Sequence, residues 1–113
     1  MAVAISTIEQ GIVLIQVTGS FLGGEETDEL RLAISDCLDR QQNKLILDVS
    51  GVTFVNSAAV GVLVSALISY KRRGWQMKLC GINKVVHTIL TVTKLNLVFD
   101  RYDTCAEAIR SIT

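Results

Sequence analysis

The sequence contains no proline, a single histidine, three widely spaced cysteines and no net charge. Without proline or a low-complexity segment nothing marks a linker, so we expect one domain over residues 1–113. The 11 basic residues balance 11 acidic ones, which argues against a general electrostatic surface for nucleic acid or membrane lipids. Cys37, Cys80 and Cys105 lack a Cys-x-x-Cys spacing, so neither a disulfide framework nor a zinc site is indicated. We expect them to be small core residues in a reduced compartment.

Segments that would direct the chain to a membrane are also lacking. Residues 1–10 contain no basic region followed by a long apolar run, so no signal peptide is predicted. The apolar stretch at residues 60–70 is too short to cross a bilayer. We therefore expect a cytoplasmic protein that does not insert into membranes.

Motifs for nucleotide binding or covalent catalysis are absent from the sequence as well. It has no G-x-S-x-G elbow, no P-loop and no G-x-G-x-x-G fingerprint. His87 is expected to be a surface or half-buried helix residue and not a catalytic one. Asp48 and Asp100 each follow a predicted strand without a second acid–base group, so we expect Asp48 to bond the following loop and Asp100 to lie in a turn. We predict no enzymatic activity, no cofactor and no metal.

The hydrophobic pattern indicates alternating strands and helices after an initial hairpin. Residues 2–20 are rich in valine, isoleucine and threonine around Gln10-Gly11, which predicts a β-hairpin. The apolar run KLILDV is typical of a strand buried on both faces of a parallel sheet. The predicted elements are strands at about 3–8 and 12–18, a helix from 25, a strand at 44–49, a helix at 57–73, a strand at 76–81, a helix at 83–93, a strand at 97–100 and a helix at 104–112.

This order predicts an α/β domain. Its sheet should be mixed and mostly parallel, with an antiparallel N-terminal hairpin and about four helices packed on it. Acidic residues open the first helix, where they complement the helix dipole. The predicted helix boundaries are Asn43 as a left-handed stop, Gly74 as a second stop, Asn83 as an N-cap, and Thr104 with Glu107 as a capping box.

Small residues occupy one side of the predicted second helix. That side consists of two rows at four-residue steps, Ser57-Gly61-Ser65-Ser69-Arg73 and Ala58-Val62-Ala66. The bulky residues, which are expected to face the sheet, are Val60, Leu63, Val64, Leu67, Ile68 and Tyr70. A small and nearly uncharged side permits close approach by another surface. A neighbouring helix of the same domain or a partner protein would equally explain it.

Ser57 stands at the start of this helix, directly after Asn56. A serine or an asparagine at this place caps a helix, and capping is the plain structural role of both residues. The functional alternative is a phosphorylation switch. A helix N-terminus tolerates a phosphate, but the phosphate adds about two negative charges to a small, apolar side. One modification would then break an interface without unfolding the domain.

The stretch LILDVSGVTFVNSAAVGVLVSA resembles the central motif of STAS domains, in particular of bacterial anti-sigma factor antagonists (anti-anti-sigma factors). In that motif a strand ending L-D-L-S-G-V is followed by D-S-S-G-L-G and an apolar helix. The resemblance extends over nearly the whole chain. It includes TKLNLVFDRYDTCAEAI, which is similar to the family's T-G-L-x-x-x-F followed by a capped last helix.

The resemblance implies a single STAS-like domain that acts as a regulatory, protein-binding switch. The unphosphorylated protein would bind an anti-sigma factor, often itself a serine kinase, and so free a sigma factor. The kinase would phosphorylate Ser57, which would release the partner, and a serine phosphatase would reset the switch. The implied partner-binding residues are Ser20, Phe21, Leu22, Gly23, Gly24, Asn56, Ser57, Ala58, Ala59, Gly61 and Ser65.

Three departures from the family pattern stand out. Asn56 replaces the motif's aspartate, so the charge that a kinase or phosphatase would meet is missing. Ala58 and Ala59 replace its second serine and glycine, and Lys94 stands where the family has glycine, which is unfavourable if that position is left-handed. These departures suggest a specialised member of the family.

Two alternatives remain at the level of sequence. A STAS scaffold that is never phosphorylated, in a signalling assembly or a lipid-transport complex, is motivated by Asn56. An enzyme using Ser57 as nucleophile is disfavoured because no base is evident. The free edge of the first hairpin also allows a homodimer.

Overall fold

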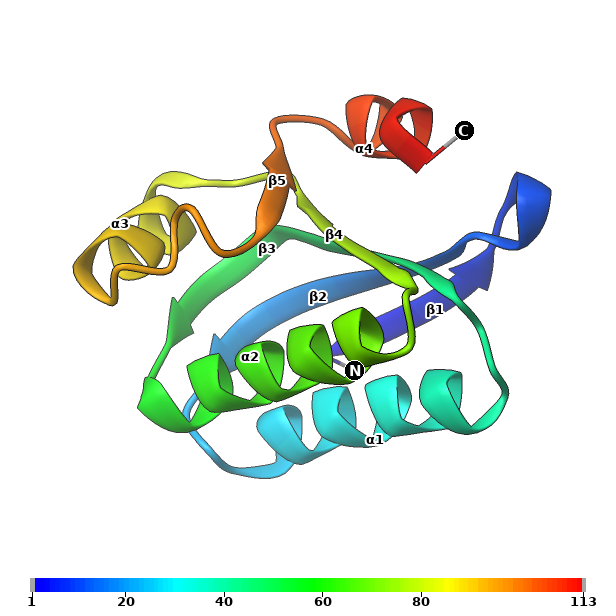
Figure 1. The fold of residues 1–113 in the computed structure, drawn as a ribbon. Coiled ribbons are helices and arrows are strands. Elements are labelled where there is room, and N and C mark those ends of the chain that lie inside the picture. Colours follow the sequence, from blue (N-terminus) through cyan, green and yellow to red (C-terminus); the bar gives the residue numbers. More distant parts are fainter. Residues whose placement is uncertain (1, 113) are drawn as a thin grey trace.

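The computed structural model describes residues 2–112, which form one five-stranded sheet with four α-helices (Figure 1). The strands are β1 (Val3–Thr7), β2 (Val13–Phe21), β3 (Lys44–Val55), β4 (Gln76–Cys80) and β5 (Asp100–Tyr102). The helices are α1 (Glu25–Asp39), α2 (Ser57–Arg72), α3 (Lys84–Val92) and α4 (Cys105–Ile112), and a short 3-10 turn covers Glu9–Gly11. The spatial order is β1-β2-β3-β4-β5. Only the β1–β2 pair is antiparallel, which confirms the predicted mixed, mostly parallel sheet with its N-terminal hairpin.

The sheet separates two apolar layers. Leu45, Ile46 and Leu47 are all fully buried, as expected for a strand covered on both faces. Leu45 and Leu47 join the larger core with residues of α1, α2 and α3, whereas Ile46 joins a smaller core with Ala108 of α4. Figure 1 shows α1 and α2 side by side on one side of the sheet, with α4 on the other.

Strand β3 is longer than its apolar run. The sequence predicted a strand to about residue 49, but β3 continues to Val55 because β2 pairs with it along its whole length, up to Phe21↔Val55. Its pairing with β4 stops at Asp48. Beyond Asp48 a side chain takes the place of β4 as hydrogen-bond donor to β3. The Nδ2 of Asn83 donates to the carbonyl oxygen of Val52 at 2.8 Å. The additional length carries the start of α2 to the end of the sheet where β2 also finishes.

Left-handed residues end three of the helices. Gln41 (φ 56°), Gly74 (φ 70°) and Lys94 (φ 62°) follow α1, α2 and α3, respectively. At each end two backbone amides turn back to the last carbonyls of the helix, as in a Schellman motif. The prediction of Gly74 as a helix stop is confirmed, and Lys94 is left-handed, so the condition under which a lysine is unfavourable at this position is met. The prediction of Asn43 as the stop of α1 is wrong, because the chain reverses two residues earlier at Gln41.

The C-terminal part differs from expectation in two details. The last strand begins at Asp100 and not at residue 97, and Asp100 lies in β5, where it forms an ion pair with Lys78 at 3.0 Å, and not in a turn. Thr104 caps α4 through its hydroxyl, which accepts from the Glu107 amide at 3.2 Å. The Thr104 hydroxyl in turn donates to a carboxylate oxygen of Glu107 at 3.0 Å. Glu107 therefore completes the capping box by bonding the side chain of Thr104.

Strand β1 is the outer strand on one side of the sheet. Its first amide, that of Val3, donates to a carboxylate oxygen of Glu29 from α1 at 2.9 Å. No helix within residues 2–112 is long and apolar enough to cross a membrane.

Candidate functional site

The start of α2 and the loop after β2 lie against each other. The amide of Asn56 donates to the carbonyl oxygen of Phe21 at 3.0 Å, which ties the two segments together at the end of the sheet. Gly23 (φ 88°) lies so near to α2 that a Cβ atom added to it would be 3.4 Å from the Cβ of Ala58. The two stretches that the sequence assigned to one partner-binding surface are therefore neighbours in space.

Either Asn56 or Ser57 could cap α2 according to the sequence, and the structure assigns the cap to Asn56. Asn56 is the N-cap of α2, and its Oδ1 accepts from the Ala59 amide at 3.1 Å. Ser57 is the first helical residue; it is exposed, and its hydroxyl has no hydrogen-bond partner among residues 2–112. The first turn of α2 contains no acidic residue. The Ser57 hydroxyl is thus free for chemistry while the helix start is held by its neighbour.

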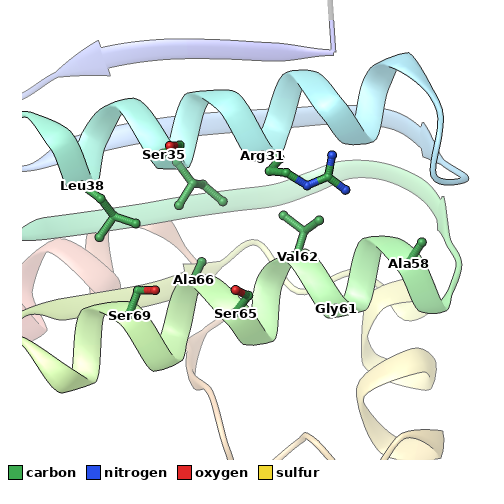
Figure 2. A pocket seen from close by; sticks show the side chains of 10 residues that line it. Arg31, Ser35, Leu38, Ala58, Gly61, Val62, Ser65, Ala66 and Ser69 are labelled. Atoms are coloured by element: carbon green, nitrogen blue, oxygen red, sulfur yellow. The ribbon is translucent and has the colours of Figure 1, made fainter.

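The small side of α2 is only partly covered. Val62 and Ala66 are buried next to α1, so the explanation by a neighbouring helix holds for their row. Gly61 and Ser65, in the other row, are exposed. An open groove of about 380 Å³ runs between the helices (Figure 2), lined by Arg31, Ile34, Ser35 and Leu38 of α1 and by Ala58, Gly61, Val62, Ser65, Ala66 and Ser69 of α2.

The opposite side of α2 packs on the sheet with one exception. Leu63, Leu67 and Tyr70 are buried as expected, and the hydroxyl of Tyr70 donates to the carbonyl oxygen of Gln42 at 2.8 Å. Ile68 is 46% exposed and does not face the sheet as predicted, because it lies at the boundary between the bulky side and solvent.

Not all of the predicted partner-binding residues are on the surface. Phe21 is fully buried and Ala59 is 1% exposed, so both contribute to the core and leave no side chain for a partner. Leu22, in contrast, is 59% exposed, and Ser20, Gly23, Gly24 and Ala58 are also exposed. The four-residue spacing already distinguishes the two alanines, since Ala59 precedes the buried Leu63 and Leu67 in its row, whereas Ala58 begins the row of Val62 and Ala66.

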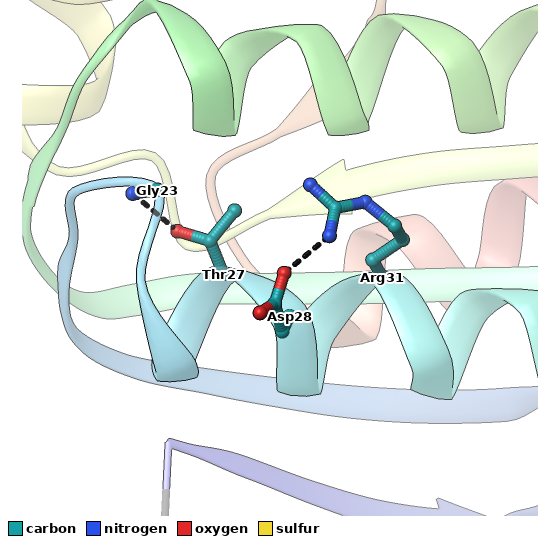
Figure 3. A network of polar contacts seen from close by, with 4 residues as sticks. All are labelled: Gly23, Thr27, Asp28 and Arg31. Atoms are coloured by element: carbon teal, nitrogen blue, oxygen red, sulfur yellow. Dashed lines mark hydrogen bonds and ion pairs between the residues drawn. The ribbon is translucent and has the colours of Figure 1, made fainter.

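Two residues of α1 belong to this region although the sequence did not indicate them. Thr27 is fully buried, and its hydroxyl accepts from the Gly23 amide at 2.9 Å, which fixes the loop after β2 (Figure 3). Arg31 forms an ion pair with Asp28 and extends over the α1 side of the groove (Figures 2 and 3). In the sequence, the contact of Thr27 with the loop is indicated only by its place in an otherwise acidic first turn. A threonine hydroxyl there can accept a hydrogen bond from a backbone amide of the preceding glycine loop.

Within residues 2–112 no hydrogen bond joins Ser57 to His87, Asp48 or Asp100. His87 lies on α3, with its Nδ1 3.2 Å from the guanidinium of Arg101. Asp48 bonds the segment that follows it, since its Oδ1 accepts from the Ser50 amide at 3.0 Å, but this segment continues strand β3 and is not the predicted loop. A possible metal-binding group in the described part of the chain consists of Asp48, Cys80 and Cys105, and two of these residues belong to or contact the small core under α4. Two cysteines that are distant in sequence are therefore adjacent in the fold.

Residues 4–108 match the model of the STAS domain family. The chain belongs to the STAS domain family. A relative named anti-sigma F factor antagonist, from Paenibacillus polymyxa, is 22% identical over 104 residues, covering 91% of this chain and 88% of the relative.

Solved structures share the fold of this STAS domain. A Thermotoga maritima protein assigned as an anti-sigma factor antagonist superposes with a TM-score of 0.88 at 24% identity, covering 96% of this chain and 92% of that one. The Bacillus cell fate determinant SpoIIAA in its phosphorylated form gives a TM-score of 0.79 at 16% identity, covering 99% of this chain and 100% of that one.

Proposed function

We propose that this STAS domain is an anti-sigma factor antagonist. In its unphosphorylated form it binds an anti-sigma factor through the start of α2 and the loop after β2. The name of the Paenibacillus relative supports the role. The observation that carries the proposal is the exposed hydroxyl of Ser57, which has no partner among residues 2–112 and lies beside a groove whose α2 side is formed mostly by small residues. The domain acts by binding and not by catalysis.

The proposed contact surface consists of exposed residues and of the half-buried Asn56. A partner placed on it would meet small groups on α2 and one large apolar side chain, Leu22, on the loop. Small residues let the backbone of the partner approach, and Leu22 supplies apolar area that is removed from water. The surface comprises Ser20, Leu22, Gly23, Gly24, Asn56, Ser57, Ala58, Gly61 and Ser65.

The partner itself is a serine kinase. Its phosphorylation of Ser57 would make it dissociate from the domain. A phosphate on the first helical residue is stabilised by the helix dipole and by the unpaired amides of the first turn, so the fold persists. The same group places about two negative charges at the centre of the contact surface. A partner that excludes water there would have to leave this charge without a counter-ion, which is costly. A serine phosphatase then restores binding.

The test is binding of candidate anti-sigma factor kinases from the source organism by isothermal titration calorimetry. Ser57→Asp should weaken the complex at least tenfold while the thermal unfolding midpoint stays near that of the native protein. The matched control is Thr88→Asp, which introduces the same charge at an exposed hydroxyl on α3, away from the groove, and should bind normally. Equal affinity of Ser57→Asp and the native protein would contradict the switch.

A second candidate is a constitutive scaffold within a signalling or lipid-transport assembly, motivated by Asn56. Its amide caps α2 as an aspartate would but carries no charge. The two candidates differ in one result. The protein is incubated with the purified partner and ATP. A switch should gain the mass of one phosphate on Ser57, whereas a scaffold should keep Ser57 unmodified and the complex intact.

A further inference from the structure

The sulfur atoms of Cys80 and Cys105 lie 2.7 Å apart on the α4 side of the sheet. Cys80 is the last residue of β4 and is fully buried, while Cys105 is the first residue of α4 and is half-buried. This contact is independent of the α2 surface, because it belongs to the smaller of the two cores.

The fold holds the two thiols together from both sides. Tyr102 at the end of β5 pairs with Cys80 across the sheet, so the chain reaches the start of α4 directly beside β4. Thr104 then caps the helix. The apolar side of α4 anchors it, because Ala108 is buried against the sheet and Ile109 packs on the same cluster. Cys105 therefore remains over Cys80 as long as α4 is docked.

We propose that Cys80 and Cys105 form a reversible redox pair, which a peroxide or a low-molecular-weight disulfide converts into an intramolecular disulfide. With hydrogen peroxide, the Cys105 thiol attacks one peroxide oxygen and becomes a sulfenic acid, releasing water. The Cys80 thiol then attacks the sulfenic sulfur and expels a second water. In total two thiols lose two electrons and two protons, and one peroxide becomes two water molecules. A dithiol reductant reverses the reaction by thiol–disulfide exchange.

The half-buried position assigns Cys105 as the residue that meets the oxidant, since Cys80 has no exposed surface. Burial raises the pKa of both thiols, and the Asp48 carboxylate raises them further, so the reduced pair is neutral at physiological pH. Neutral thiols react slowly with peroxide. The proximity of Cys80 instead ensures that a sulfenic acid, once formed, is captured.

The sulfur separation favours a bond between the sulfurs over a shared metal ion. Asp48, Cys80 and Cys105 offer three ligand atoms within 4.8 Å of one another. Two thiolates on a tetrahedral zinc, at about 2.3 Å from the metal, would be about 3.8 Å apart. The two sulfur atoms, 2.7 Å apart, are closer than that, so a shared zinc ion would have to move them apart, whereas a bond between them would not.

The third thiol provides an internal control. Cys37 lies on α1, is 1% exposed and belongs to the larger core on the opposite side of the sheet. It should therefore neither pair with Cys80 or Cys105 nor react in the folded protein.

The experiment treats the full chain with hydrogen peroxide or oxidised glutathione, blocks free thiols under denaturing conditions, and measures intact mass and peptide maps. We expect one blocked thiol, that of Cys37, and one cross-linked peptide that joins Cys80 to Cys105. If the oxidised protein is first treated with dithiothreitol, all three thiols should be free. The oxidised protein should unfold at a temperature higher by on the order of 10 °C, because the bond closes a loop between residues 25 positions apart.

Variants separate the pair from general oxidation. Cys37→Ala should still form the cross-link, whereas Cys105→Ser and Cys80→Ser should each remain without it. A Cys105 that stays reduced, or that accumulates as a glutathione adduct or sulfinic acid without capture by Cys80, would overturn the proposal. A cross-link that involves Cys37 would overturn it too. Since all these outcomes are read from mass, they do not depend on whether the α2 surface binds a partner.

Discussion

At the scale of single residues, the left-handed helix ends show where the sequence is not optimal for stability. Of the three residues that end α1, α2 and α3 in this conformation, only Gly74 is a glycine. Lys94→Gly should stabilise the protein by about 0.5–1 kcal/mol, because a side chain at positive φ is strained and glycine is not. The measurement is urea unfolding of the two proteins. Thr88→Gly, an exposed site within α3, should have the opposite effect, and a loss of stability in Lys94→Gly would contradict the argument.

The same residues show which helix ends were predictable. Gly74 is predictable because glycine is the usual residue for this conformation, and at Lys94 the family pattern, which places a glycine there, indicates it. Gln41 is not predictable, since glutamine has no preference for positive φ, whereas asparagine tolerates it and makes the nearby Asn43 the expected stop. The stop at Gln41 is held by two backbone hydrogen bonds, from the Gln41 amide to the Leu38 carbonyl at 3.1 Å and from the Gln42 amide to the Cys37 carbonyl at 2.9 Å.

At the scale of elements, Asn83 links α3 to β3 by using both ends of its amide group. Its Oδ1 caps α3 by accepting from the Val86 amide at 2.9 Å, and its Nδ2 donates to β3 carbonyls that β4 does not reach. Asn83→Ala should therefore destabilise the protein by about 2 kcal/mol, one part from the lost cap and one from an unpaired, partly buried carbonyl. Asn83→Ser retains a cap but no amide donor, so its loss in urea unfolding should be about half. Equal losses would mean that the bonds to β3 contribute nothing.

The lengths of elements were harder to predict than their order. The order followed from alternating apolar runs, and it was right throughout. Strand β3 extends past Asp48 and Ser50, which interrupt its apolar pattern, because its pairing partner β2 continues. Strand β5 begins late because pairing with β4 positions it, whereas the apolar residue Leu97, which suggested an earlier start, is 91% exposed. Pairing between strands is not visible in the pattern of one strand.

At the scale of the whole molecule, buried thiols make the free energy of unfolding depend on pH in the alkaline range. Burial raises the pKa of Cys37 and Cys80 in the folded state, while in the unfolded chain cysteine titrates near about 8.5. Above that pH the unfolded state loses protons that the folded state retains, so the free energy of unfolding decreases by up to about 1.4 kcal/mol per pH unit for each thiol. Below about pH 8 these groups should have no effect.

Urea unfolding between pH 7 and 10 in the presence of a reductant measures this dependence. Cys37→Ala should reduce the slope above pH 8.5, whatever its effect on stability at pH 7. An unchanged slope would show that Cys37 does not titrate differently in the two states.

How much of the candidate site could be predicted also depends on the whole molecule. The motif around Ser57 located one half of the surface, and the resemblance to STAS domains supplied the loop after β2. The sequence could not show that Asn56 alone makes the cap, because both neighbours are good capping residues. Nor could it show that α1 covers Val62 but leaves Gly61 open, since this depends on how the two helices cross.

The bond between Glu29 and the first amide of β1 has a consequence for the behaviour of many copies of the chain. Sheets aggregate through unpaired strands at their edges. At one edge Glu29 occupies an amide that an added strand would need, and at the other edge β5 offers only three residues. Growth into fibrils by backbone pairing is therefore hindered at the start of β1 and limited to three residues at β5.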